Sequence, residues 1–516
     1  MRYVYGITAA LLLGGSAATL TLQPVGAQTA QNEPAQIQAA APRGAPMSFA
    51  DLAARLQPAV VNISTRQSIQ ISRQRQLPPG FEEFFRRFGG EVPQGEGDGT
   101  VTQRGGSLGS GFIISADGYI VTNNHVVAPA RNNAIVESIT VTLADRTEYQ
   151  ARLIGRDTQS DLALLKIEPQ GNLPFVRFGD STQTRVGEWV LAIGNPFGLG
   201  GTVTAGIVSA LHRNIGAGAY DRYIQTDASI NSGNSGGPMF DLQGNVIGIN
   251  TALISPTGGN VGIGFAIPAE QARPVIEALQ RGQRVQRGYI GVGLQQIDES
   301  LAAALGIERN RGELIRTVTA GGPAARAGIQ QGDVVITVAG RPVTPDETLA
   351  YIVSQQRIGS RVPIELVRNG RRQTVTVAIA ERPTEEELAR INNAEEEQEL
   401  VEAPRDQQTT SQRSARESLG LTVQALTPEI ARTLRITEPN IRGVVVAGVD
   451  PNSDAAAKGL RTGDIILSIN QRATPSPEEA AAAVQAARDA GRNTVLLLVR
   501  RGNNAPIYIG VELIRR

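Results

Sequence analysis

Three short motifs contain the residue types that acyl-transfer chemistry requires. Residues 233–238 read Gly-Asn-Ser-Gly-Gly-Pro, a glycine-rich turn that can expose the hydroxyl of Ser235 to a substrate carbonyl. A serine hydroxyl is a poor nucleophile until a base removes its proton, and the chain has only 2 histidines. His125 lies in the run 122–127 at the end of a predicted hairpin strand, whereas His212 lies in a predicted loop. We therefore expect His125 to be the base.

A carboxylate must then hold the imidazole in one tautomer and stabilise the imidazolium. Asp161 fits best, because it directly precedes an apolar strand predicted over 162–167 and can reach the domain interior. Asp145 and Asp157 are predicted to be exposed turn acids. The chain order His, Asp, Ser is that of chymotrypsin-like enzymes and differs from the orders in subtilisin and α/β-hydrolases. Each motif alone also fits an ordinary loop, histidine or strand cap, but the three together predict a catalytic triad.

The turn around the serine also predicts an oxyanion hole. Its donors would be the backbone N–H groups of Gly233, Asn234 and Ser235, each contributing about 3–4 kcal/mol of transition-state stabilisation. We expect no cofactor and no metal, because the sequence has no cysteine, no histidine pair at i and i+4, and no phosphate-binding glycine loop before a helix.

Length and composition limit the architecture that must position these residues. At 516 residues the chain exceeds one ordinary core, and a prior of roughly 150 residues per domain suggests about three domains. An apolar content of 41% with 57 glycines and 4% aromatic residues favours a soluble protein rich in strands and turns. Lys+Arg and Asp+Glu balance at 49 each, so we expect no nucleic-acid partner.

The N-terminus predicts export. Arg2 precedes an apolar run over 7–22, and the small residues Val25-Gly26-Ala27 suit cleavage, so 1–27 is predicted to be a signal peptide and the location the periplasm. An uncleaved anchor is the alternative, although the run is shorter than the roughly 20 residues of a spanning helix. We expect no integral segment later in the chain, and peripheral membrane contact stays open. Residues 28–47 are predicted to be a flexible leader.

Residues 48–282 show short apolar runs separated by turn residues, which indicates a mainly β domain. A hairpin is predicted over 107–124, and a helix over 269–281 leads out of the domain. The stretch 66–106 is interpreted as an insertion that interrupts the strands and carries an aromatic cluster, Phe81, Phe84, Phe85 and Phe88. That cluster fits either a short helix covering its own loop or a regulatory or subunit-contact element.

The C-terminal part contains an internal repeat. Residues 322–336 parallel residues 453–467, each a predicted helix, a glycine turn, a Gly-Asp turn and an apolar strand. We therefore predict two similar modules, at 283–382 and 416–516. The linker between them, 383–415, starts with the capping-box pattern Thr384-Glu-Glu-Glu.

Several of these segments together resemble the HtrA (Do/DegP-like) family of periplasmic serine endoproteases: 122–127, 160–167, 192–198, 226–238 and 262–268. The resemblance implies a mainly β fold, with a chymotrypsin-like double β-barrel protease domain followed by two PDZ domains of α+β type. It implies ATP-independent cleavage of unfolded or misfolded envelope proteins. It also implies a homotrimer or a higher multiple of trimers.

The resemblance further assigns binding residues. A small apolar specificity pocket would be formed by Ile230, Leu253 and Asn234, which implies cleavage after small aliphatic residues. In the first repeat, Tyr289, Ile290, Gly291 and Val292 resemble the loop of PDZ domains that binds a peptide C-terminus. The second repeat has a similar loop at 418–421 and could instead serve assembly. The insertion has no cysteine pair, which excludes redox control of that loop.

Two functions of other classes remain as alternatives. A peptide-binding chaperone or scaffold with a vestigial protease domain would be compatible with PDZ tandems, but all three triad residues are present. Another acyl-transfer hydrolase, such as an esterase, is disfavoured by the chain order and by the Gly-Asn-Ser-Gly-Gly turn. Chaperone activity alongside proteolysis is compatible with the sequence.

Overall fold

The computed structural model describes residues 48–71, 101–129, 134–196, 201–216, 218, 220–231, 233–253, 261–384, 386–388, 390, 419–434, 436 and 441–514. The chain forms two units, Met1–Arg55 and Leu56–Arg516, and the described part of the first belongs to helix α3 (Ala50–Leu56) and the two residues before it. The predicted signal peptide, the leader up to residue 47 and the four phenylalanines of the insertion lie outside the described residues. No described helix is long and apolar enough to span a membrane.

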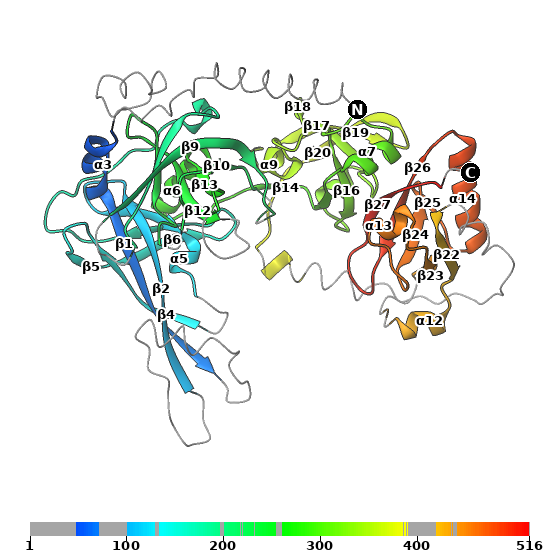
Figure 1. Cartoon of the computed structure of the whole chain (residues 1–516), viewed down its shortest axis with the longest axis horizontal. Helices are drawn as coiled ribbons and strands as arrows, with labels where there is room; N and C mark the ends of the chain where they lie inside the picture. The colour runs from blue at the N-terminus through cyan, green and yellow to red at the C-terminus, as the bar shows by residue number, and fades with distance from the viewer. Residues whose placement is uncertain are drawn as a thin grey trace, which may run out of the picture. The chain divides into compact units, whose positions relative to one another are not determined.

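The larger unit begins with a seven-stranded antiparallel sheet of order β5-β4-β1-β2-β3-β7-β6 (Figure 1). Its buried aliphatic residues, among them Ile63, Ile113 and Leu165, form one core. The elements are η1 (Gln57–Ala59), β1 (Val60–Ile71), β2 (Val101–Ile113), β3 (Tyr119–Asn123), α5 (Asn124–Val127), β4 (Ala134–Thr142), β5 (Glu148–Gln150), β6 (Arg152–Asp157) and β7 (Leu162–Lys166).

The predicted bounds of the insertion, 66–106, are wrong at both ends. Strands β1 and β2 continue into it and pair without a break from Val60↔Phe112 to Ile71↔Val101. Polar and glycine residues do not end these strands, because β1 is paired on both sides, with β2 and, as far as Ile69, with β4, and these ladders need backbone hydrogen bonds rather than an apolar face. The paired strands therefore reach Ile71 and begin again at Val101, and residues 72–100 lie outside the described part of the chain.

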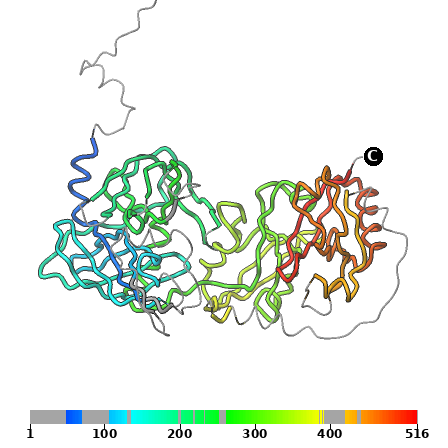
Figure 2. The backbone as a smooth tube through the Cα atoms, turned by 60° about the horizontal axis from the view of Figure 1, so that its bottom comes forward, coloured from blue at the N-terminus to red at the C-terminus, as the bar shows by residue number. Residues whose placement is uncertain are grey.

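A closed barrel of order β10-β13-β12-β11-β8-β9 follows and lies beside the first sheet (Figure 2). Helix α6 (Ala269–Gln280) follows it, close to the predicted bounds, and packs against β6, β7 and β12. His212 lies within β9, not in a loop, in a left-handed backbone conformation with φ of 56°. The barrel elements are η2 (Ser181–Gln183), β8 (Trp189–Gly194), β9 (Thr202–Arg213), β10 (Tyr223–Thr226), β11 (Pro238–Phe240), β12 (Val246–Leu253) and β13 (Gly264–Pro268).

The two sequence repeats form sheets of the same topology, β15-β16-β17-β19-β20 and β22-β23-β24-β26-β27, and a small strand pairs with the third strand of each. The first has β14 (Gly288–Tyr289), β15 (Val292–Gln295), α7 (Glu299–Leu305), β16 (Glu313–Val318), α8 (Pro323–Arg326), β17 (Val334–Val338), β18 (Arg341–Pro342), α9 (Leu349–Ser354), β19 (Arg361–Arg368), β20 (Arg371–Ala378) and β21 (Ala380–Glu381). The second has β22 (Leu421–Ala425), α12 (Pro428–Thr433), β23 (Val444–Val449), α13 (Asp454–Ala457), β24 (Ile465–Ile469), β25 (Arg472–Ala473), α14 (Pro477–Asp489), β26 (Thr494–Arg500) and β27 (Ile507–Glu512).

The same ion pair holds the Gly-Asp turn of both repeats, and sequence reasoning missed it. Asp333 is 1% exposed and accepts hydrogen bonds from Arg368 Nε at 2.7 Å and Nη2 at 2.6 Å. Arg501 binds Asp464 in the same two-pronged way, at 2.7 Å for both nitrogens. Each arginine lies more than 30 residues beyond its aspartate, so only the strand pairing brings the two together.

The predicted capping box after the first repeat is confirmed. Thr384 N–H donates to Glu387 Oε2 at 2.8 Å, and Glu387 N–H donates to Thr384 Oγ1 at 3.1 Å. These reciprocal bonds satisfy two amides at a helix start that would otherwise lack partners.

Candidate active site

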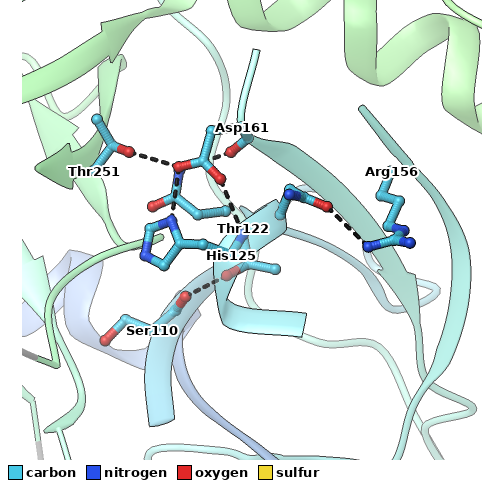
Figure 3. Close-up of polar contacts among 8 residues, drawn as sticks. Ser110, Thr122, His125, Arg156, Asp161 and Thr251 are labelled. Atoms are coloured by element: carbon cyan, nitrogen blue, oxygen red, sulfur yellow. Dashed lines mark hydrogen bonds and ion pairs between the residues drawn. The ribbon is translucent and has the colours of Figure 1, made fainter. Parts of the chain in front are cut away.

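Asp161 and His125 meet where β7 and the short helix α5 begin. His125 Nδ1 lies 2.7 Å from Asp161 Oδ2, and the His125 backbone N–H donates to Asp161 Oδ1 at 2.9 Å (Figure 3). Because a carboxylate can only accept, this contact places the proton on Nδ1 and leaves Nε2 free to act as a base. The His125 side chain is 48% exposed, so the imidazole remains accessible to a substrate.

The backbone around Asp161 is held in an unusual conformation. Its φ is 53°, in the left-handed region that a residue with a Cβ adopts only when its surroundings stabilise it. Asn124 N–H and Asn123 Nδ2 both donate to the Asp161 carbonyl, at 3.0 and 2.9 Å. These bonds turn the carboxylate toward His125.

Thr251 is a third contact of the carboxylate, and sequence reasoning missed it. Its hydroxyl donates to Asp161 Oδ2 at 2.8 Å from strand β12 of the barrel (Figure 3). The two residues are 90 positions apart, and no local motif links them. Thr251 therefore positions the acid from the opposite half of the domain.

The serine turn is packed against the first sheet. Ser110 N–H, in β2, donates to the Ser235 carbonyl at 2.8 Å, and Ser110 Oγ donates to the Gly233 carbonyl and accepts from Asn195 N–H. Gly233 has φ of 112°, and a Cβ there would lie 2.5 Å from Pro196 Cβ. Only glycine fits this position, which explains one residue of the motif, and Ser110 is a second positioning residue that the sequence did not reveal.

Gly109 lies between the histidine motif and the backbone of the serine turn. A Cβ on Gly109 would lie 2.6 Å from Val126 Cγ2, next to His125, and 3.2 Å from the Ser235 carbonyl oxygen. Within the described part of the chain, no hydrogen bond joins the His125 ring to the Ser235 hydroxyl. Such bonds are often long in unliganded enzymes and tighten when substrate binds.

The expected role of the Asn234 amide in the oxyanion hole is wrong. Its N–H donates to the Asn231 carbonyl at 3.2 Å, so it is not available to an oxyanion. Its side chain also stabilises the turn, donating to the Ser229 carbonyl and accepting from Asn231 N–H. Among the described residues, the amides of Gly233 and Ser235 donate to no protein acceptor, so two of the three predicted donors are free.

Two other polar residues differ from expectation or take no part. Asp157 is not an exposed turn acid but a largely buried one that binds Arg287 through both carboxylate oxygens. Although burial raises the pKa of Asp157, the bonds from Arg287 hold it below its usual value. Burial and the nearby Arg222 charge lower the pKa of His212, and among the described residues its side chain forms no hydrogen bond with Asp161 or Ser235.

The predicted specificity residues lie on the barrel side. Ile230 is 1% exposed and belongs to the barrel core, and its Cγ1 would lie 2.5 Å from a Cβ at Gly264. The backbone of Leu253 ends strand β12, but its side chain lies outside the described part.

In the first repeat, residues 289–292 line a cavity together with helix α9. Gly291 has φ of 79°, and its carbonyl accepts from Thr319 N–H. In the second repeat Gly420, with φ of 70°, accepts from Asp450 N–H in the same way, while Ser418 lies outside the described residues. Both repeats therefore have the same glycine turn before their first strand.

Comparison with known families identifies the protease domain and both repeats. A model of the trypsin-like peptidase domain matches residues 109–249, and two models of the PDZ domain match residues 288–379 and 408–500. The mainly β, trypsin-like architecture with two PDZ domains is thus confirmed.

Individual proteins are similar over most of the chain. A probable periplasmic serine endoprotease described as DegP-like from Brucella suis is 40% identical over 484 residues, covering 89% of this chain and 88% of the relative. The protein so described from Rhizobium meliloti is 38% identical, covering 94% of this chain and 96% of the relative. Among solved structures, the HtrA-type protease AlgW with decapeptide has a TM-score of 0.52 at 38% identity, covering 66% of this chain and 100% of that one.

Proposed function

Because this chain belongs to the DegP-like family of HtrA-type periplasmic serine endoproteases, we propose that Ser235, His125 and Asp161 carry out its peptide-bond hydrolysis. The observation that carries this assignment is the 2.7 Å contact between His125 Nδ1 and the Asp161 carboxylate. It fixes the tautomer in which Nε2 can accept the proton of Ser235.

In the proposed reaction, Ser235 Oγ attacks the substrate carbonyl while His125 Nε2 removes its proton. The imidazolium then donates this proton to the leaving amine, and a water molecule hydrolyses the acyl-enzyme by the reverse route. Asp161 keeps the proton on Nδ1 and stabilises the imidazolium, and the Thr251 hydroxyl holds Asp161 in place. The amides of Gly233 and Ser235 stabilise the oxyanion of both tetrahedral intermediates.

We propose that the substrates are unfolded or misfolded envelope proteins, cleaved after small aliphatic residues without ATP. The burial of Ile230 in an apolar core supports a pocket that takes short aliphatic side chains. Since such residues are buried in native proteins, only unfolded chains would offer them to the cleft.

The first PDZ domain is proposed to bind substrate C-termini through residues 289–292. A bound peptide would add a strand beside β15, and several such weak contacts would raise the concentration of the chain at the protease. The AlgW structures bound to a decapeptide and to a tripeptide support peptide binding by proteins of this type. The second PDZ domain could serve assembly, and a homotrimer or a multiple of trimers is the proposed state.

The proposed location is the periplasm, after removal of residues 1–27. The curated relatives described as periplasmic support this location. N-terminal sequencing of the protein recovered from the periplasm should begin at Gln28, and an N-terminus at Met1 would favour the membrane anchor instead.

The test of the catalytic assignment is cleavage of reduced, unfolded β-casein by the chain starting at Gln28 and by its Ser235→Ala variant, without ATP or metal. Cleavage by the first alone supports the triad, and mass spectrometry of the products should find Val, Ala or Ile before the cut. Cleavage by both would refute the role of Ser235.

Chaperone activity is a second proposed function, supported by the PDZ cavity, which lies apart from the triad residues in the sequence. Ser235→Ala should then still bind casein and slow its aggregation. If it binds none, the chaperone activity is refuted while the protease assignment stands.

A further inference from the structure

Glu313, the first residue of β16, is a buried acid that the proposed hydrolysis does not use. It is 7% exposed, and its Oε2 accepts a hydrogen bond of 2.8 Å from the Leu349 N–H at the first position of α9. Among the residues that the structure describes, no donor contacts the second oxygen, Oε1. Oε1 is not among the buried side-chain atoms that lack a hydrogen-bond partner, so it keeps contact with solvent. Because Glu313 also lines a cavity, a donor from a ligand can reach this oxygen and form a hydrogen bond to a charged group.

The second PDZ domain has a valine at the same place. Glu313 pairs with Val335, the second residue of β17, and Val444 pairs with Ile466, the second residue of β24. Val444 is fully buried within the core of its domain. This fold therefore packs well with an apolar residue here, and the sheet itself does not require an acid.

The start of helix α9 accounts for one oxygen of the acid. The Leu349 N–H has no partner inside its helix, and Glu313 supplies one. Helix α14 of the second domain begins with Pro477, which has no N–H and needs no acceptor beside it. Oε1 is left without any such role.

Glu313 lines the same cavity as residues 290–292 of the loop proposed to bind a peptide C-terminus. Of the described residues that line this cavity, Glu313 is the one acid and Arg382 the one cation. Arg382 follows Glu381, whose ladder partner Gly288 directly precedes the loop. Arg382 thus lies at the end of the cavity next to the loop, where a peptide carboxylate would bind. Glu313 lies at a different point along the same cavity.

Helix α9 gives the distance along the cavity between Glu313 and the loop proposed to bind the peptide carboxylate. Leu349 contacts Glu313 at the start of the helix, and a Cβ on Gly288 would lie 2.2 Å from the Val353 carbonyl near its end. Four helical residues rise about 6 Å, which an extended peptide covers in about two residues of roughly 3.3 Å each. A peptide with its carboxylate at the loop therefore brings the residue two places before its last one level with Glu313. Side chains two apart face the same side of a strand.

We propose that Glu313 makes the first PDZ domain select peptides with lysine or arginine two places before the C-terminal residue, an inference that rests on the proposed peptide binding by this domain. The cation would donate to Oε1 in a charge-assisted hydrogen bond, which is stronger than a neutral one and stronger still when shielded from water. Burial, partly opposed by the Leu349 N–H, raises the pKa of Glu313 to about 7. A nearby cation favours the ionised carboxylate, so ligand binding and ionisation support each other.

The test uses the full chain with Ser235→Ala, which prevents cleavage, and fluorescein-labelled ten-residue peptides ending in valine. Fluorescence polarisation at pH 8 measures the affinity of each peptide. Lysine is compared with norleucine at two positions, either two places or one place before the C-terminal valine. Lysine two places before should tighten binding about tenfold, and lysine one place before should not, because that side chain faces away. Adding Glu313→Gln should abolish the gain, whereas Glu365→Gln, on an exposed part of β19, removes the same charge and should keep it.

Two results would overturn the inference while leaving peptide binding intact: no gain from lysine two places before the valine, or a gain that survives Glu313→Gln. Glu313 would then serve only as an acceptor for α9. The comparison of lysine and norleucine peptides uses the chain that carries Ser235→Ala alone. Its result therefore does not depend on whether Glu313→Gln folds. If no peptide binds, or if C-terminal amides bind as well as carboxylates, the proposed function of the domain fails instead.

Discussion

Replacing Glu313 by glutamine should remove a pH dependence from the stability of the first PDZ domain. Burial raises the pKa of Glu313 from its ordinary 4.5 to about 7, so between these values the folded chain holds a proton that the unfolded chain has lost. Stability should therefore fall as pH rises from 4.5 to 7 and stay level above. The fall amounts to about 3 kcal/mol, because each pKa unit corresponds to about 1.36 kcal/mol.

Glutamine is neutral at every pH, and its side-chain oxygen can still accept from Leu349 N–H. The variant should match the wild type near pH 4.5 and be more stable at pH 8. Hydrogen-exchange mass spectrometry of β16 and α9, in the full chain with Ser235→Ala, measures this difference at several pH values. Strand β23 is the internal control, since Val444 occupies the equivalent position there.

Equal pH slopes for β16 in the wild type and in Glu313→Gln would refute this reasoning. Stability of β16 that rises between pH 4.5 and 7 would refute it as well, because the sign would then belong to an acid with a lowered pKa.

Three further predictions concern the ion pairs and the catalytic site. Arg368→Met leaves the buried Asp333 unpaired and should cost about 3–5 kcal/mol in calorimetry. Arg501→Met should have a similar cost, since Asp464 is also 1% exposed. Variants as stable as the wild type would contradict the role of burial. Thr251→Val should lower kcat about tenfold with KM unchanged, because one hydrogen bond to the Asp161 carboxylate is lost. Thr251→Ser keeps the hydroxyl and should restore kcat. An unchanged kcat in Thr251→Val would show that Thr251 does not position the acid. Gly233→Ala should reduce casein cleavage roughly 100-fold, because the φ of 112° at Gly233 and the neighbouring Pro196 exclude a Cβ. Its circular dichroism spectrum should be unchanged. Cleavage at the wild-type rate would contradict the assigned turn.

The sequence by itself was sufficient for the fold class and the class of enzyme. The glycine turn around Ser235 is local, and only two histidines compete for the role of base, so few assignments were compatible with the chain. The internal repeat likewise needs no structure to be seen, and the comparisons confirm that both copies are PDZ domains. The triad and the remaining oxyanion donors, Gly233 and Ser235, stay predictions that the proposed experiments address, and the domain bounds stay predictions as well.

Only the tertiary structure decided which distant groups touch. Thr251 reaches Asp161 across 90 positions, and Arg368 reaches Asp333 through strand pairing, so neither contact follows a local spacing rule. The Asn234 amide was expected in the oxyanion hole, but the turn directs it to Asn231, because backbone direction depends on φ and ψ rather than on residue type. Glu313 looked in the sequence like any other acid. Its burial, and therefore its raised pKa, depends on the sheet and helix that fold over it.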